Sequence, residues 1–136
     1  MSKMIVEDLQ RFLEVEFPQN HAVVEAVKPM WAQIRLPYKE DYLRPGGTVS
    51  GPALMTAADT AMYVALMAEI GPIALAVTSN FSINFMRKPA PQDIIAEARI
   101  FKIGKHLAFG EILIFSEGKE APVAQATCTY SIPAGP

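Results

Sequence analysis

The spacing of hydrophobic residues along the chain predicts two helices of different character. Residues 6–17 place apolar side chains on one side of a helix and acidic ones on the other, and Pro18 ends the pattern. Residues 53–70 are apolar on nearly every side, which is typical of a helix buried all round. Ser50 is a suitable N-cap for this central helix, and Gly71 follows its last turn.

Alternation of apolar and polar residues predicts strands on both sides of the central helix. The expected strands cover residues 22–28, 30–36, 73–86, 93–103, 107–116 and 121–132. Short turns separate the last four, so we expect each of them to pair with its chain neighbour in an antiparallel sheet. The predicted fold class is α+β: a curled antiparallel sheet of about five to six strands around one central helix, plus an N-terminal helix.

Composition narrows the class of protein. A length of 136 residues with 51% hydrophobic and 19% charged residues predicts one globular domain over residues 1–136. A net charge of −2 gives no electrostatic basis for binding nucleic acid. The polar residues Thr56, Asp59 and Thr60 indicate that the central helix is buried in protein and does not span a membrane. The single Cys128 and the lack of a signal-peptide pattern favour the cytoplasm.

Asp59 is the main candidate for chemistry. It is the only carboxylate between Arg44 and Glu69, and burying a lone acid is costly without a partner or a function. The glycine-rich segment 46–51 precedes the helix, whose first N–H groups and dipole suit a carbonyl oxygen. Helical rise separates Asp59 from Gly51 by about 12 Å. The two can serve one site only if a substrate lies along the helix or a second subunit supplies one half.

Structural explanations of the same residues stay open. Asp59 could be a buried acid bonded to hydroxyl groups such as those of Tyr63 or Thr78, and glycines before a helix commonly just form a turn. Thr78 and Asn80 are expected on one polar face of the strand over residues 73–86, and such faces are normally solvated.

Two segments carry the most specific pattern in the chain. The first is Ser50-Gly51-Pro52 followed by Asp59, and the second is Thr-Ser-Asn-Phe-Ser-Ile-Asn-Phe-Met-Arg-Lys-Pro at residues 78–89. Together they resemble the hotdog-fold thioesterases, in the branch related to phenylacetate-pathway and 4-hydroxybenzoyl-CoA thioesterases. The resemblance extends over about residues 22–132. It implies acyl-CoA hydrolysis at a subunit interface, in a homodimer or homotetramer, with no cofactor or metal.

The resemblance also implies roles for individual residues. Asp59 matches the family's carboxylate, as general base or nucleophile, and the Gly51 N–H matches its oxyanion donor. Thr78 matches a hydroxyl that helps to hold the attacking water or the carboxylate. Ser50, which we include in the catalytic set, stands where the family has histidine, and Arg44 stands where it frequently has asparagine or glutamine. These two departures keep a second function open, a non-catalytic acyl-CoA-binding protein of the same fold.

The remaining candidates would contact substrate. Arg87 and Lys88 lie in one predicted turn, and Lys105 and His106 lie in another. Two turns at one end of a sheet could present all four to the phosphates of coenzyme A, although solvated turns have the same composition. We place Arg44 and Asn80 in the same substrate-binding set. A hydratase of this fold would need a histidine near the central helix, and residues 50–71 contain none.

Overall fold

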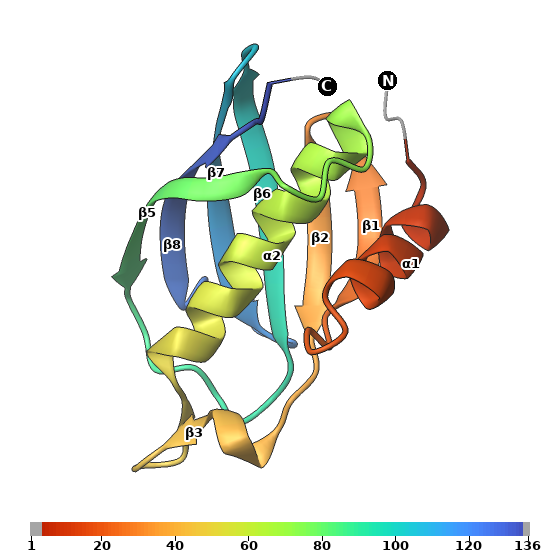
Figure 1. Ribbon diagram of the computed structural model, residues 1–136. Coiled ribbons are helices and arrows are strands. Elements are labelled where there is room, and N and C mark those ends of the chain that lie inside the picture. The colour runs from red at the N-terminus through yellow and green to blue at the C-terminus, as the bar shows by residue number, and fades with distance from the viewer. Residues whose placement is uncertain (1–3, 135–136) are drawn as a thin grey trace.

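The computed structural model describes residues 4–134, which form a curved sheet with one long helix across it (Figure 1). The elements are α1 (Val6–Glu16), β1 (Val23–Lys28), β2 (Trp31–Leu36), a 3₁₀ turn (Glu40–Tyr42), β3 (Leu43–Arg44), β4 (Thr48–Val49), α2 (Gly51–Ile70), β5 (Val77–Phe85), β6 (Ile94–Ile103), β7 (Leu107–Ser116) and β8 (Ala124–Ser131). Six strands make one antiparallel sheet in the order β1-β2-β6-β7-β8-β5. The predicted α+β class, the central helix and the N-terminal helix are confirmed.

The ends of α2 follow the expected capping pattern. The Ser50 hydroxyl accepts a hydrogen bond from the Ala53 N–H, and Gly71 adopts a φ of 95° immediately after the last turn. The length and hydropathy of α2 would suit a membrane span, but 72% of its most apolar window is buried inside the fold. Its apolar residues therefore belong to the core of the protein.

Gly110 on β7 lets α2 approach the sheet closely. A Cβ at this position would lie 2.6 Å from the Arg99 carbonyl oxygen and 3.0 Å from the sulfur of Met62, which is fully buried on α2. A Cβ essentially never lies as close as 2.6 Å to another heavy atom, so the neighbouring strand would have to move, and the Met62 side chain would have to give way as well. Glycine at this one position thus sets how tightly helix and sheet pack.

The expected pairing of successive strands is wrong at one place. β5 pairs with β8 and not with β6, because β6 pairs with β2 on its other side. The connecting segment 86–93 contains Pro89 and Pro91, which hold the chain extended and cannot donate ladder hydrogen bonds. In Figure 1 this segment passes along one end of the sheet and does not form a hairpin.

β5 differs from its prediction in length and in side-chain direction. It begins at Val77, and a register shift between Thr78 and Asn80 interrupts the alternation. Thr78 pairs with the buried Tyr130 on the helix side of the sheet, whereas Asn80 pairs with Thr129 on the outer face. The expectation that Thr78 and Asn80 share one face is therefore wrong, because the bulge turns the chain between them.

Candidate active site

The carboxylate of Asp59 is held by two hydroxyl groups. Thr78 Oγ1 donates to Asp59 Oδ1 at 2.5 Å, and the Tyr130 hydroxyl lies 3.0 Å from the same oxygen. Asp59 comes from α2, Thr78 from β5 and Tyr130 from β8, so the three meet only when the helix lies on the sheet. Both donors act on Oδ1, which orients the carboxylate and leaves Oδ2 as the oxygen that neither hydroxyl contacts.

Tyr130 is the site residue that sequence reasoning missed. Burial raises the pKa of its phenol well above the usual range, and the negative charge of Asp59 raises it further, so the hydroxyl keeps its proton and donates it. Tyr63, considered from sequence as a partner of Asp59, instead donates to the Ala74 carbonyl at 3.3 Å. In the sequence, Tyr130 is one more apolar position on a buried strand face, and only its pairing with Thr78 reveals its role.

Two hollows adjoin Asp59. One has a volume of about 310 Å³ and lies between α1, α2 and the start of β5, with Tyr63, Thr78 and Tyr130 in its lining. The other, of about 300 Å³, is lined by Met55, Thr56, Asp59, Thr78 and Phe81. A group bound in either hollow would contact the Asp59 side chain.

A larger cavity of about 710 Å³ surrounds the start of α2. Gly51 is the first residue of the helix, so its N–H has no acceptor within the helix. A Cβ at Gly51 would lie 3.2 Å from the Phe85 ring, so the absence of a side chain lets the ring lie close to the helix start. The hydroxyl of Ser50, which lines the same cavity, caps the helix.

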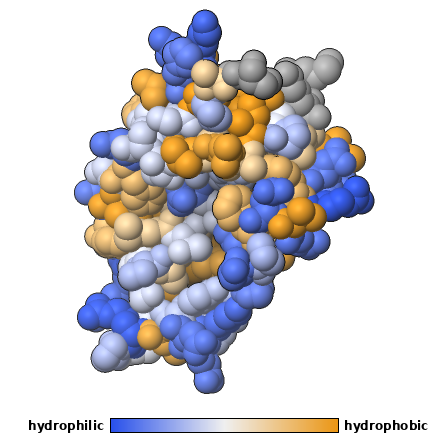
Figure 2. All heavy atoms as spheres, viewed as in Figure 1, coloured by the Kyte–Doolittle hydropathy of each residue, from blue (hydrophilic) through white to orange (hydrophobic). Residues whose placement is uncertain are grey.

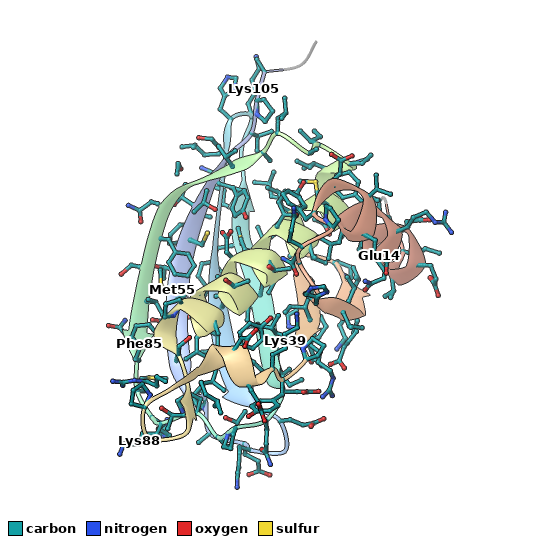
Figure 3. All side chains as sticks on the ribbon, turned by 60° about the horizontal axis from the view of Figure 1, so that its bottom comes forward. Glu14, Lys39, Met55, Phe85, Lys88 and Lys105 are labelled. Atoms are coloured by element: carbon teal, nitrogen blue, oxygen red, sulfur yellow. The ribbon has the colours of Figure 1, made fainter. Side chains whose placement is uncertain are left out.

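Three of the predicted basic residues line this cavity. Arg44, Arg87 and Lys88 lie around the start of α2, and Figure 3 shows Lys88 near Phe85. The Arg87 guanidinium donates to the Pro122 carbonyl at 2.7 Å, which fixes the base of its turn. The cavity thus combines a helix N-terminus with positive charge, an arrangement suited to an anionic ligand.

The expected cluster of all four basic turn residues does not form within one chain. Lys105 and His106 line a separate hollow at the far end of β6 and β7 (Figure 3). The ten residues of each of these strands separate the two ends of the sheet by about 30 Å. Asn80, on the outer face, is likewise separated from Asp59 by the sheet.

One chain also keeps Gly51 and Asp59 apart. Asp59 does not line the cavity at Gly51, and Gly51 lines neither hollow beside Asp59. Next to both lies β5, whose outer edge has no strand partner among residues 4–134. Figure 2 shows hydrophobic side chains over this strand, and Val77 and Phe85 are each more than half exposed.

Comparisons with known proteins agree with this architecture. Residues 46–131 match the family model of the thioesterase superfamily. A protein from Silicibacter sp. TM1040, provisionally assigned as a thioesterase, is 46% identical, with a TM-score of 0.90 over 98% of this chain and 94% of that one. A provisionally assigned esterase from Thermoplasma acidophilum is 29% identical over 74% of each chain. The phenylacetic acid degradation protein PaaI from Thermus thermophilus is 25% identical, with a TM-score of 0.72 over 90% of this chain and 99% of that one.

The family match covers the central helix, Asp59 and four of the six sheet strands. The similarity in structure extends over nearly the whole chain. The chain therefore belongs to the thioesterase superfamily and is a hydrolase with the hotdog fold.

Proposed function

We propose that the enzyme hydrolyses an acyl-CoA thioester at a site shared by two copies of the chain. Asp59 acts as general base or nucleophile, and the Gly51 N–H of the partner subunit stabilises the developing oxyanion. The observation that carries the proposal is the Asp59 carboxylate, with Oδ1 held by Thr78 and Tyr130 and a hollow on either side. Such a carboxylate is oriented for attack through Oδ2, directly or through a water molecule.

The free edge of β5 supports a dimer. Isologous antiparallel pairing of β5 about its midpoint, Phe81, would place Val77 of one copy opposite Phe85 of the partner subunit. Since Phe85 lies against Gly51, this pairing would bring the helix start of one copy toward Asp59 of the other. It would also cover the exposed apolar residues of the strand. A dimer is the smallest assembly that this arrangement requires, and a tetramer would contain the same pair.

The charge around Gly51 supports coenzyme A as the carrier. Arg44, Arg87 and Lys88 line the cavity at the helix start, and guanidinium and ammonium groups bind phosphate oxygens. A CoA thioester bound there would direct its acyl end along α2, toward the site formed with the second copy.

Thiol release from a panel of acyl-CoAs tests the proposal. Asp59→Asn keeps the size of the side chain but removes its negative charge, and we expect turnover to fall by about 10²–10⁴-fold. Asp41→Asn changes an exposed acid that lines none of these cavities and should leave turnover unchanged. Wild-type rates in Asp59→Asn would refute the role of Asp59.

One observation favours the alternative of acyl-CoA binding without hydrolysis. Ser50, which stands where the family resemblance implies a histidine, uses its hydroxyl to cap α2 at 3.4 Å from the Ala53 nitrogen. The alternative predicts saturable binding of acyl-CoA with no release of thiol. Any release that depends on Asp59 would exclude it.

A further inference from the structure

The hollow between α1 and α2 is partly built by a segment outside the family match. That match begins at residue 46, yet Leu13, Phe17 and Asn20 form one wall of the cavity of about 310 Å³ that reaches Asp59. Asp59, Thr78 and Tyr130 line the same cavity. The wall therefore lies outside the residues that the family model matches, whereas Asp59, Thr78 and Tyr130 lie within them.

The N-terminal wall is firmly attached to the core. Leu13 is buried, and the ring of Phe17 meets the ring of Tyr63 edge-on, with 5.3 Å between centroids. Asn20 Nδ2 donates to Thr60 Oγ1 at 2.9 Å, and Asn20 Oδ1 accepts from the Ala22 N–H at 2.9 Å. These contacts hold the wall at a fixed distance from Asp59.

We infer that the acyl group of the substrate occupies this cavity and that the N-terminal wall limits its length, so that short- and medium-chain acyl-CoAs are the preferred substrates. The inference rests on the proposed function. A volume of about 310 Å³ is at the lower end of the range for ligand pockets. Apolar walls on α1 and at the start of β5 suit a hydrocarbon chain whose carbonyl carbon lies beside Asp59.

The second hollow beside Asp59 is less suited to the acyl group. It is formed by Met55 and Phe81, next to the free edge of β5, where the proposed dimer would bring the helix start of the partner subunit. That position lies between Asp59 and the basic cavity of the second copy. The CoA part of the substrate would therefore occupy this second hollow.

The test compares kcat/KM for butanoyl-, octanoyl-, dodecanoyl- and hexadecanoyl-CoA. Phe17→Ala removes part of the wall, so we expect the optimum to move to longer chains, by up to about fourfold in kcat/KM per additional methylene buried. Phe109→Ala is the matched control, because Phe109 is similarly exposed and makes one aromatic contact, with Phe101 at 5.9 Å, on the outer face of the sheet. Ala74→Leu narrows the cavity and should move the optimum to shorter chains.

Three results would overturn the inference. The first is a wild-type kcat/KM that is highest for hexadecanoyl-CoA. The second is a dependence of kcat/KM on chain length that is the same in Phe17→Ala and in wild type. The third is a dependence that changes in Met55→Phe but not in Phe17→Ala. Calorimetry can measure the affinity of the same four acyl-CoAs for Asp59→Asn, with and without Phe17→Ala. Because Asp59→Asn should not hydrolyse them, this measurement applies the same criteria to binding alone. Hydrolysis that continues at the wild-type rate in Asp59→Asn would refute the proposed function. A chain-length dependence of binding that is the same with and without Phe17→Ala would instead refute the acyl cavity.

Discussion

The Tyr130 hydroxyl lies 3.0 Å from Asp59 Oδ1, although the two residues come from β8 and from α2. If this contact positions the carboxylate, Tyr130→Phe should lower kcat about tenfold and leave KM nearly unchanged. Tyr63→Phe is the control, since the two rings are 6.0 Å apart but the Tyr63 hydroxyl bonds to the Ala74 carbonyl. Steady-state kinetics of both variants measure kcat and KM, and their melting temperatures show whether either substitution destabilises the fold. Equal effects in both variants would mean that Tyr130 has only a packing role.

The shared site predicts complementation between two inactive variants. Asp59→Asn removes the carboxylate, and Gly51→Pro removes the N–H at a helix position where proline is tolerated. If each site uses Asp59 from one copy and Gly51 from the other, co-refolding equal amounts should restore about a quarter of wild-type activity. Gly51→Ala keeps the N–H and should stay active with a small shift of the Phe85 ring. No recovery on mixing would place both residues in one subunit's site.

The basic cavity at the helix start predicts a charge effect on substrate binding. Lys88→Glu should raise KM for acyl-CoA about five- to tenfold at low salt, because it places a negative charge near the phosphates. Added salt should reduce the difference from wild type. Arg11→Glu, an equal charge change on the exposed side of α1, should leave KM unchanged. An equal rise in both variants would indicate a long-range effect of net charge instead.

Gly110 predicts a large loss of stability on a small substitution. Gly110→Ala forces a methyl group against the Arg99 carbonyl and the Met62 sulfur, and we expect a loss of about 1–3 kcal/mol in unfolding free energy. Gly104→Ala is the matched control, because its Cβ would meet only the Leu107 carbonyl at 3.4 Å. Urea unfolding of both variants measures the difference. Equal stabilities would mean that the helix–sheet spacing adjusts freely.

Arg35 on the outer face of the sheet predicts a pH-dependent contribution to stability. Burial opposes ionisation of Glu25 and Asp93, but hydrogen bonds and the charge of Arg35 outweigh it and lower both pKa values. Arg35 Nε lies 2.7 Å from Glu25 and Nη1 2.9 Å from Asp93, and Arg35 also pairs with Glu117. Lowered carboxylate pKa values stabilise the fold above the ordinary values of 4.5 and 3.8, and the gain is lost as the pH falls through the lowered values.

Arg35→Gln should therefore cost about 1–2 kcal/mol at pH 7, a modest amount because these side chains are about a quarter exposed. The difference from wild type should shrink as the pH falls from 7 through the lowered pKa values of the two carboxyl groups, because their protonated forms no longer carry the charge that pairs with Arg35. Urea unfolding over a series of pH values measures it. A difference that is independent of pH would mean that Arg35 acts through packing.

The amino-acid sequence by itself determined both helices and most strand positions, and it singled out the lone acid Asp59 and the glycine at the helix start as candidate site residues. These features are local, because hydrophobic period, capping residues and prolines each act within a few positions of the chain. The alternation over residues 77–85 also indicated a strand, although nothing local showed that β5 would lie at an edge of the sheet.

Only the tertiary structure decided which side chains meet Asp59. Tyr130 reaches Asp59 because β8 pairs with β5, and Asn80 lies on the opposite face because a bulge interrupts the strand between Thr78 and Asn80. Phe17 lines a hollow beside Asp59 because α1 packs beside α2. Each contact joins segments that are distant in sequence, so its partner depends on strand order and on helix–sheet packing. The hydrophobic periodicity of the sequence indicates whether a residue is buried. Which residues it packs against depends on the folded chain alone.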